Sequence, residues 1–216
     1  MAAMQTLTDN FLRAVGKPSL DQRKQLQAAL LQEGVWGLDV LESAVHLTAA
    51  TLAMTIPEVM VHGMRLYTVP LGVVEKVPRL GSLDLLSNTS ITPQLALYPD
   101  MNHTAVRATD AQRQPKPLQL PKFDLICMNP PFARTCEDNL LFGSLPKHER
   151  KRLKQALQRL LKKGPIAASV KAGLASVFIA VADRYLRAGG RLAFVAPKTL
   201  LSGVTWKASR QLLMQH

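Results

Sequence analysis

Short apolar segments that end at turns alternate with longer segments of helical periodicity, and this alternation constrains the fold most. In the second half of the chain, residues 123–128 read FDLICM and residues 191–196 read RLAFVA, each followed by a proline-containing turn. Between them, residues 149–161 and 170–187 carry apolar side chains at helical spacing. Strands alternating with helices are typical of a parallel, doubly wound sheet. We therefore predict an α/β fold whose ligands lie at the carboxyl ends of the strands.

The first half fits the same pattern less completely. Residues 1–33 are predicted to be helical, because Ser19 precedes a glutamine by three residues and an apolar stripe follows. A short buried strand at residues 35–40 comes next and has an acid near its end. A further helix is predicted to be capped by Ser43 and stopped or kinked at Pro57.

Two stretches are harder to interpret. Residues 58–79 are apolar but broken by proline and glycine, and no element is assigned to them. Residues 79–86 are predicted to be a strand end that leads into a loop. Residues 87–122 contain five prolines and little periodicity. We predict a long loop or insertion there, and loops of that length are usually functional or disordered.

Charge separates the two halves. Residues 1–100 carry seven Lys/Arg and nine Asp/Glu, whereas residues 101–216 carry twenty and six. Such asymmetry predicts a surface that faces a polyanion, most simply nucleic acid, or else a solvated basic face. Residues 147–163 concentrate the charge, with eight basic side chains against one acid. The candidate phosphate contacts are Lys147, Arg150, Lys151, Arg152 and Lys154, with Arg159, Lys162 and Lys163 beyond them.

Composition excludes several classes of protein. A hydrophobic content of 47% excludes a mainly disordered chain. No run reaches the roughly 18 uncharged apolar residues of a membrane span, and no signal peptide is recognisable, so we expect a cytoplasmic protein without membrane association. Cys127 and Cys136 are too few for a disulfide framework. The five histidines show no ligand spacing, so no metal site is predicted.

The segment Asn129-Pro130-Pro131-Phe132 directly after residues 123–128 is the strongest chemical signal. The side-chain oxygen of Asn129 and the backbone carbonyl of Pro130 are acceptors, and the prolines fix the direction of the backbone. Phe132 offers a flat apolar face for stacking on a planar ring. Together these groups suit an exocyclic amine on an aromatic ring, although a tight structural turn is the alternative interpretation.

Two acceptors on the hydrogens of such an amine favour a pyramidal nitrogen, whose lone pair is then free to attack an electrophilic methyl group. The proton leaves after the nitrogen has become cationic, so no strong general base is needed beforehand. The acceptors lie where positive charge develops, which is electrostatic preorganisation. This chemistry requires no catalytic histidine or cysteine.

The strand, this four-residue motif, a helix and the later GGRLAFVAP segment together resemble the amino-methyltransferases that use S-adenosylmethionine. The resemblance is greatest to the adenine-N6 DNA methyltransferases of restriction–modification systems. It implies a Rossmann-like sheet with flanking helices, transfer of a methyl group to adenine N6 in DNA, and catalysis by Asn129, Pro130, Pro131 and Phe132. It also implies a base flipped out of the duplex and stacked on Phe132.

The resemblance extends to two acidic positions. Gly37-Leu38-Asp39-Val40 is similar to the motif in which an acid ends a strand and binds the ribose of the cofactor. Gly81-Ser82-Leu83-Asp84 is similar to the motif in which an acid lies near the cofactor adenine. The resemblance thus implies S-adenosylmethionine binding by Asp39 and Asp84. A helix-capping role for Asp39 and a plain turn role for Asp84 remain as alternatives.

The glycine-rich first motif of the family has no counterpart in residues 1–33, and the last strands of the family sheet are not matched. The resemblance therefore implies a partial catalytic domain, incomplete at both ends. Residues 34–57 would form its ribose-binding region, residues 87–122 a loop or insertion, and residues 123–214 its catalytic half. A missing N-terminal part or a restriction subunit is an implied partner. A ribosomal RNA base-amine methyltransferase, a release-factor glutamine methyltransferase and a non-catalytic nucleic-acid-binding remnant are the alternative functions.

Overall fold

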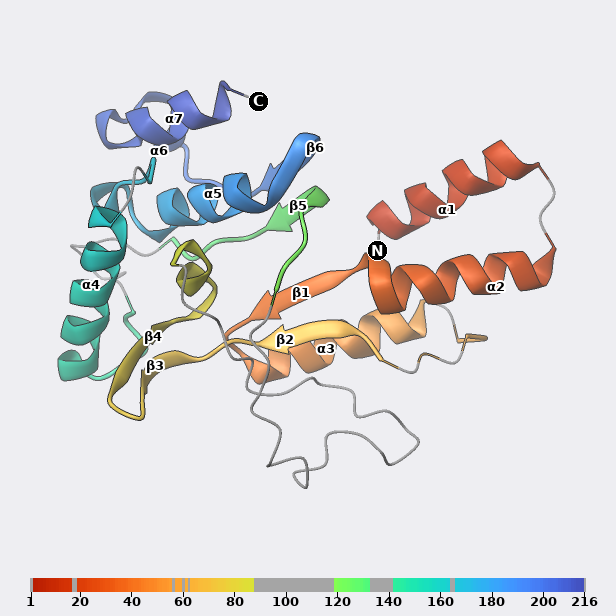
Figure 1. Cartoon of the computed structure of the whole chain (residues 1–216), viewed down its shortest axis with the longest axis horizontal. Helices are drawn as coiled ribbons and strands as arrows, with labels where there is room; N and C mark the ends of the chain where they lie inside the picture. Colours follow the sequence, from red (N-terminus) through yellow and green to blue (C-terminus); the bar gives the residue numbers. More distant parts are fainter. Residues whose placement is uncertain are drawn as a thin grey trace. The chain divides into compact units, whose positions relative to one another are not determined.

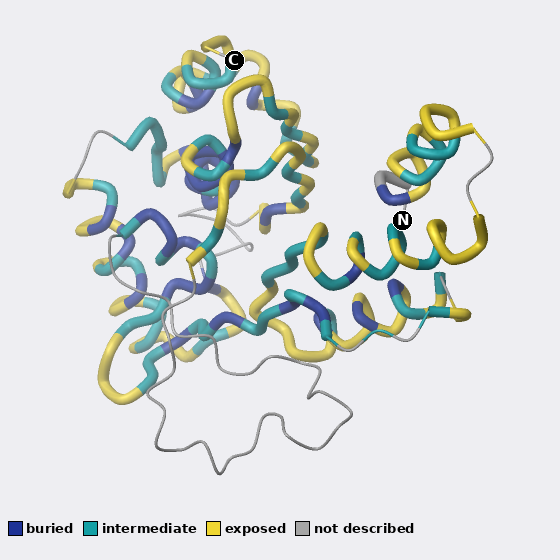
Figure 2. Tube along the Cα trace, turned by 45° about the vertical axis from the view of Figure 1, so that its right-hand side comes forward, coloured by how far each residue is buried: buried dark blue, intermediate teal, exposed yellow. Residues whose placement is uncertain are grey.

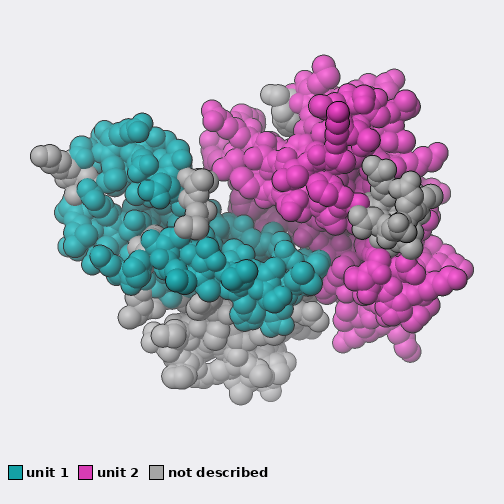
Figure 3. Space-filling model, turned by 180° about the vertical axis from the view of Figure 1, so that it is seen from behind, with its two compact units in different colours: residues 1–69, 92–116 teal, residues 70–91, 117–216 magenta. Residues whose placement is uncertain are grey.

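The computed structural model describes residues 2–16, 19–55, 57–59, 61, 63–87, 119–132, 142–163 and 166–215. The chain divides into two compact units, coloured separately in Figure 3. Unit 1 comprises Met1–Val69 and Thr92–Lys116, and unit 2 comprises Pro70–Ile91 and Pro117–His216. The predicted loop at residues 87–122 lies almost entirely outside the described residues.

Unit 1 contains a strand–helix–strand arrangement preceded by helices (Figure 1). Its elements are α1 (Ala2–Val15), α2 (Leu20–Ala29), the π-helix η1 (Leu30–Gly34), β1 (Trp36–Asp39), α3 (Glu42–Met54) and β2 (Arg65–Thr68). The two strands are parallel, with Trp36 opposite Arg65 and Asp39 opposite Thr68. The predicted capping box is confirmed, because the Ser19 side chain accepts the backbone N–H of Gln22.

The core of unit 1 lies between these helices and the strand pair. Its buried side chains are Met4, Leu31, Val45, Ala49, Leu52, Met64 and Leu66. Gly37 permits the close approach of the strands, because a Cβ atom there would lie 2.7 Å from the Cδ2 atom of Leu66. A larger residue at this position would displace a core side chain.

Unit 2 contains the remaining elements. They are β3 (Leu71–Val74), β4 (Val77–Leu80), the 3-10 helix η2 (Gly81–Leu86), β5 (Phe123–Met128), α4 (Lys147–Lys162), η4 (Val170–Ala172), α5 (Leu174–Tyr185), β6 (Leu186–Phe194), α6 (Thr199–Ser202), η5 (Val204–Trp206) and α7 (Lys207–Leu213). β3 and β4 form an antiparallel hairpin. β5 and β6 are parallel, with a register irregularity between Phe123 and Leu125.

The helix α5 is the most deeply buried element of unit 2 (Figure 2). Eight of its residues are buried, and Ala175 and Ile179 share a core with Leu200 and Trp206. Met128 and Phe194, the last residues of β5 and β6, pack against this core. The carboxyl ends of the two strands are therefore held by the same apolar cluster that anchors α5.

The prediction of a mixed α/β chain is confirmed, but the described residues form three separate two-stranded sheets and not one continuous sheet. The predicted strand at residues 123–128 is β5 with the same bounds. The strand predicted at residues 191–196 begins earlier, at Leu186, and ends at Phe194. Residues 58–79, which received no assignment, contain β2, β3 and part of β4.

Candidate functional site at the end of β5

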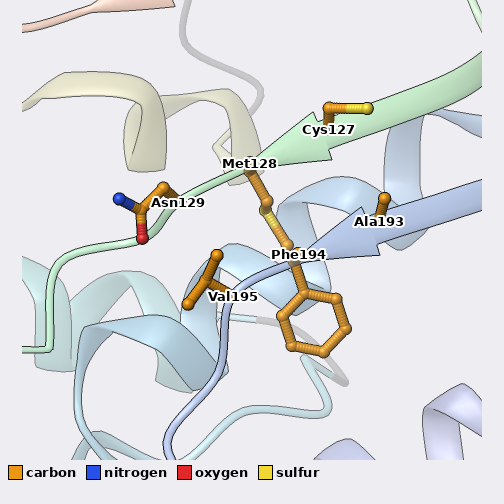
Figure 4. A pocket seen from close by; sticks show the side chains of 6 residues that line it. All are labelled: Cys127, Met128, Asn129, Ala193, Phe194 and Val195. Carbon is orange, nitrogen blue, oxygen red and sulfur yellow. The ribbon is translucent and has the colours of Figure 1, made fainter. Parts of the chain in front are cut away.

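Asn129 lies directly after the carboxyl end of β5 (Figure 4). Met128 is opposite Phe194 in the parallel register, and the Val195 N–H donates to the Met128 carbonyl at 3.2 Å. The pairing thus continues one residue beyond the last residue of β6. It places Asn129 and Val195 side by side, each on the chain that leaves its strand.

An open depression lies around this strand end, with a volume of about 520 Å³. It is shallow and open to solvent, and it does not enclose a cavity. Its lining residues are Cys127, Met128, Asn129, Ala193, Phe194 and Val195. Figure 4 shows Cys127 and Ala193 pointing to one side of the strands, and Met128 and Phe194 to the other. Asn129 supplies the side-chain amide among these otherwise apolar or weakly polar groups.

The residues after Asn129 differ in exposure. Pro130 is buried, Pro131 is exposed, and the Phe132 side chain keeps 44% of its surface accessible. The proline rings restrict the backbone at two successive positions, so the direction of the Pro130 carbonyl is limited. Of the four predicted catalytic residues, Asn129 lines the depression, whereas Pro130, Pro131 and Phe132 are not among its lining residues. The exposed carboxamide of Asn129 can accept hydrogens from a ligand, and the accessible ring of Phe132 can stack on a planar one.

The strand end also includes residues that the sequence did not assign to a site. Val195 is 54% exposed, which is unusual for a large apolar side chain in a strand-like segment, and Phe194 lines the same depression. The sequence predicted a strand before Pro197 but did not define which strand lies beside it, so neither residue was assigned to the site.

Asp39 lies at the carboxyl end of β1, where the sequence predicted an acid. It is exposed, and its Oδ1 atom accepts the Leu41 N–H at 2.8 Å. The prediction that Ser43 caps the next helix is wrong, because α3 begins at Glu42 and its N-cap residue is Leu41. The Asp39 side chain, which bonds the backbone two residues on, shapes this turn instead.

Asp84 lies in η2 and has a role in the fold. Its Oδ2 atom accepts the Leu80 N–H at 2.9 Å, which joins the end of β4 to η2. Burial raises the pKa of Asp84 above its ordinary value of 3.8, and the Leu80 N–H and the nearby Arg79 charge oppose this shift. Asp84 is not among the residues that line the depression at Asn129.

The predicted phosphate contacts lie on α4, whose apolar side packs on the β3–β4 hairpin through Leu153, Leu157 and Leu160. Lys147, Lys151 and Arg152 are exposed, and Lys154 is partly exposed. Arg150 differs from them. It is partly buried, and its Nε atom has no hydrogen-bond partner among the described residues. Its position therefore makes it a poorer candidate for a phosphate contact than the other four.

Comparison with protein-family models, curated proteins and solved structures found no match.

Among the described residues, no group of three or more histidine, cysteine, aspartate or glutamate side chains is placed to hold a metal ion. Within the same described ranges, no helix combines the length and the apolarity needed to cross a bilayer.

The two acids fit S-adenosylmethionine unequally. Asp39 presents an exposed carboxylate at a strand end, which suits a ribose diol that donates two hydrogen bonds. Asp84 is held by the Leu80 N–H, and its burial disfavours the charged form. The structure therefore favours the turn interpretation of Asp84, whereas Asp39 remains a suitable ribose ligand.

Proposed function

We propose that this chain carries the catalytic half of an S-adenosylmethionine-dependent methyltransferase that acts on the N6 amine of adenine in DNA. The observation that carries the proposal is the position of Asn129. An exposed carboxamide, a proline carbonyl and an accessible phenyl ring follow one another at the carboxyl end of a strand in a parallel pair. Ligands of open α/β sheets bind at such strand ends.

The roles of the residues follow from their chemistry. The Asn129 side-chain oxygen and the Pro130 carbonyl accept the two hydrogens of the adenine amine, and Phe132 stacks on the ring. These contacts turn the nitrogen lone pair out of conjugation with the ring. When bound, S-adenosylmethionine supplies a methyl group on a positively charged sulfur. Asn129 and Pro130 stabilise the positive charge that develops on the adenine nitrogen, and the surplus proton then leaves to solvent.

The Rossmann-like sheet is part of the same proposal. Each unit supports it separately with one parallel pair. In unit 1, β1 ends at Asp39, which we propose as a ligand of the cofactor ribose. In unit 2, Asn129 directly follows β5, and we propose that it contacts the amine that receives the methyl group.

Replacement of the carboxamide tests the proposal. We expect Asn129→Ala to lower methyl transfer to adenine in duplex DNA by about 10²–10³-fold, the usual effect of removing one preorganised contact to a developing charge. Asn10→Ala is the matched control, because Asn10 is an exposed asparagine in α1 of unit 1. Transfer of labelled methyl groups is measured for both variants and the wild type. Equal rates in the two variants would contradict the proposed role of Asn129.

A further inference from the structure

The exposed surface of α4 is strongly cationic and has no acid of its own to balance it. Lys147, Lys151, Arg152, Arg159, Lys162 and Lys163 are exposed. The single acid of the helix, Glu149, faces the hairpin, where its Oε2 atom accepts the Val73 N–H at 3.4 Å. None of these six basic side chains forms an ion pair within the described part of the chain.

Most of the cations follow two flanks of the helix, which include the partly exposed Lys154, and Lys162 lies on the exposed surface between the flanks. At 3.6 residues per turn, Lys147, Lys151 and Lys154 follow one flank, and Arg152, Arg159 and Lys163 follow a second, roughly 130° around the axis. Around the helix axis, Gln158 lies close to the first flank, and Gln155 lies near the middle of the exposed surface. The buried leucines occupy the opposite side, against the β3–β4 hairpin, beside which α4 runs in Figure 1.

The separation of the flanks suggests the polyanion. A helix with side chains is about 10–12 Å across, so flanks 130° apart lie on the order of 10 Å from each other. The major groove of B-form DNA is about 12 Å wide and admits one α-helix between two rows of phosphates. The major groove of A-form RNA is deep and narrow and does not admit a helix in this way.

We propose that α4 docks along the major groove of duplex DNA, with one cationic flank facing the phosphates of each strand. The inference shares with the proposed function the premise that DNA is the substrate, but it concerns binding and requires no methyl transfer. Contacts to phosphates position a protein on the duplex without reading the sequence. α4 would thus supply a salt-dependent anchor for the duplex.

Three variants of equal charge test the inference. The first removes one flank (Lys147→Gln, Lys151→Gln and Lys154→Gln), and the second removes the other (Arg152→Gln, Arg159→Gln and Lys163→Gln). The control replaces three exposed cations on other helices (Arg13→Gln, Arg23→Gln and Lys207→Gln). Each variant has a formal net charge of +9, where the wild type has +12. Gln is a good helix former, so α4 should persist, and far-ultraviolet circular dichroism checks that it does.

Binding is measured by fluorescence anisotropy with a labelled 20-base-pair DNA duplex, without S-adenosylmethionine and over a series of salt concentrations. We expect each flank variant to bind at least tenfold more weakly at 0.1 M salt, and its slope of log K against log salt to fall by about 2–3. The control variant should lose less than threefold. An RNA duplex of the same sequence should bind more weakly and respond little to the flank substitutions.

Three results would overturn the inference. Equal losses in the flank and control variants would show a general charge effect. Loss from one flank alone would show contact with a single row of phosphates and not docking in a groove. An RNA duplex that binds as tightly as DNA with the same losses would exclude a groove of B-form width. Flank-dependent DNA binding in a wild-type chain that transfers no methyl group would contradict the proposed function and leave this inference standing.

Discussion

At the scale of single residues, the two predicted cofactor acids show how surroundings decide the role of a carboxylate. Asp39 and Asp84 each accept a backbone N–H, from Leu41 and Leu80 respectively. Asp39 is exposed, whereas Asp84 is partly buried, and its pKa is raised mainly by desolvation. The exposed Asp39 carboxylate is accessible to a ligand, whereas the burial of Asp84 disfavours the charged form of its carboxyl group.

This difference makes the stability effect of Asp84 dependent on pH. Its folded pKa lies above 3.8, so the stability that the protonated form contributes is present below pH 3.8 and is lost as the pH rises through the folded pKa. Asp84→Asn keeps an oxygen for the Leu80 N–H and does not titrate. We therefore compare the free energies of unfolding of Asp84→Asn and the wild type. The difference should increase in favour of Asp84→Asn as the pH rises from 3.8 through the folded pKa of Asp84, and should be constant above it.

Urea unfolding of both proteins between pH 3 and pH 7 measures this difference. Asp84→Ala is the companion variant, because it removes the acceptor and should cost about 1–2 kcal/mol at neutral pH. A difference between Asp84→Asn and the wild type that does not change with pH would contradict the shift in the pKa of Asp84.

At the scale of elements, two buried hydroxyl groups connect α5 to α7. Ser176 and Ser209 are fully buried, and their Oγ atoms lie 2.8 Å apart. The Ser176 Oγ atom also accepts the Ser169 N–H at 3.0 Å. Within the described part of the chain, Ser176 therefore has two hydrogen-bond partners and Ser209 has one. A buried polar group that loses its partner destabilises the fold by about 1–3 kcal/mol.

We expect Ser176→Ala to lower the free energy of unfolding by about 2 kcal/mol and Ser209→Ala by about 1 kcal/mol. The double variant should cost little more than Ser176→Ala alone, because the shared bond is lost only once. Chemical unfolding of the three variants measures these values. A larger cost for Ser209→Ala than for Ser176→Ala would refute the assignment of the second bond to Ser176.

The strand β5 pairs with β6 on one edge, and no described strand pairs with its other edge. Because Val195 donates to the Met128 carbonyl, the parallel pattern directs the amides of Ile126 and Met128 toward β6 and those of Leu125 and Cys127 away from it. We expect Leu125 and Cys127 to exchange their amide hydrogens at least tenfold faster than Ile126 and Met128. Exchange measured residue by residue by NMR tests this. Equal protection of all four amides would show that a further strand covers the open edge.

The sequence predicted the elements whose signals are local. β5 was predicted with its observed bounds because an apolar run ends at a proline that cannot extend the ladder. The β3–β4 hairpin was missed because its turn residues, Glu75 and Lys76, adopt positive φ angles of 49° and 65° without the glycine or asparagine that usually signals such a turn. The orientation of Arg150 was also missed, since it depends on how α4 packs on that hairpin.

For the candidate site, too, the sequence predicted the residues with local signals and missed those that depend on three-dimensional packing. Asn129 and Asp39 lie at the ends of short parallel strands, as the alternation of apolar runs and helices indicated. The role of Asp84 could not be settled from the sequence, because the bond from Leu80 depends on the geometry of η2. The neighbours of Asn129 on β6 depend on register, which the sequence alone does not define.

At the scale of the whole molecule, the charge asymmetry has a structural correlate in unit 2. Residues 101–216 carry twenty Lys/Arg, and six of these cations are the exposed basic residues of α4 and its C-cap. The same unit holds Asn129 and the depression around it. A basic surface and the proposed amine-binding strand end on one unit suit a substrate that is both anionic and rich in exocyclic amines, and nucleic acid has both properties.

The identity of the methylated product tests this account most directly. The chain is incubated with isotopically labelled S-adenosylmethionine and equal amounts of duplex DNA and ribosomal RNA, and the nucleosides are then separated by mass spectrometry. The account predicts labelled N6-methyladenine from DNA, and its loss in Asn129→Ala. Label in RNA nucleosides, or no label with protein shown to be folded and to bind S-adenosylmethionine, would contradict it.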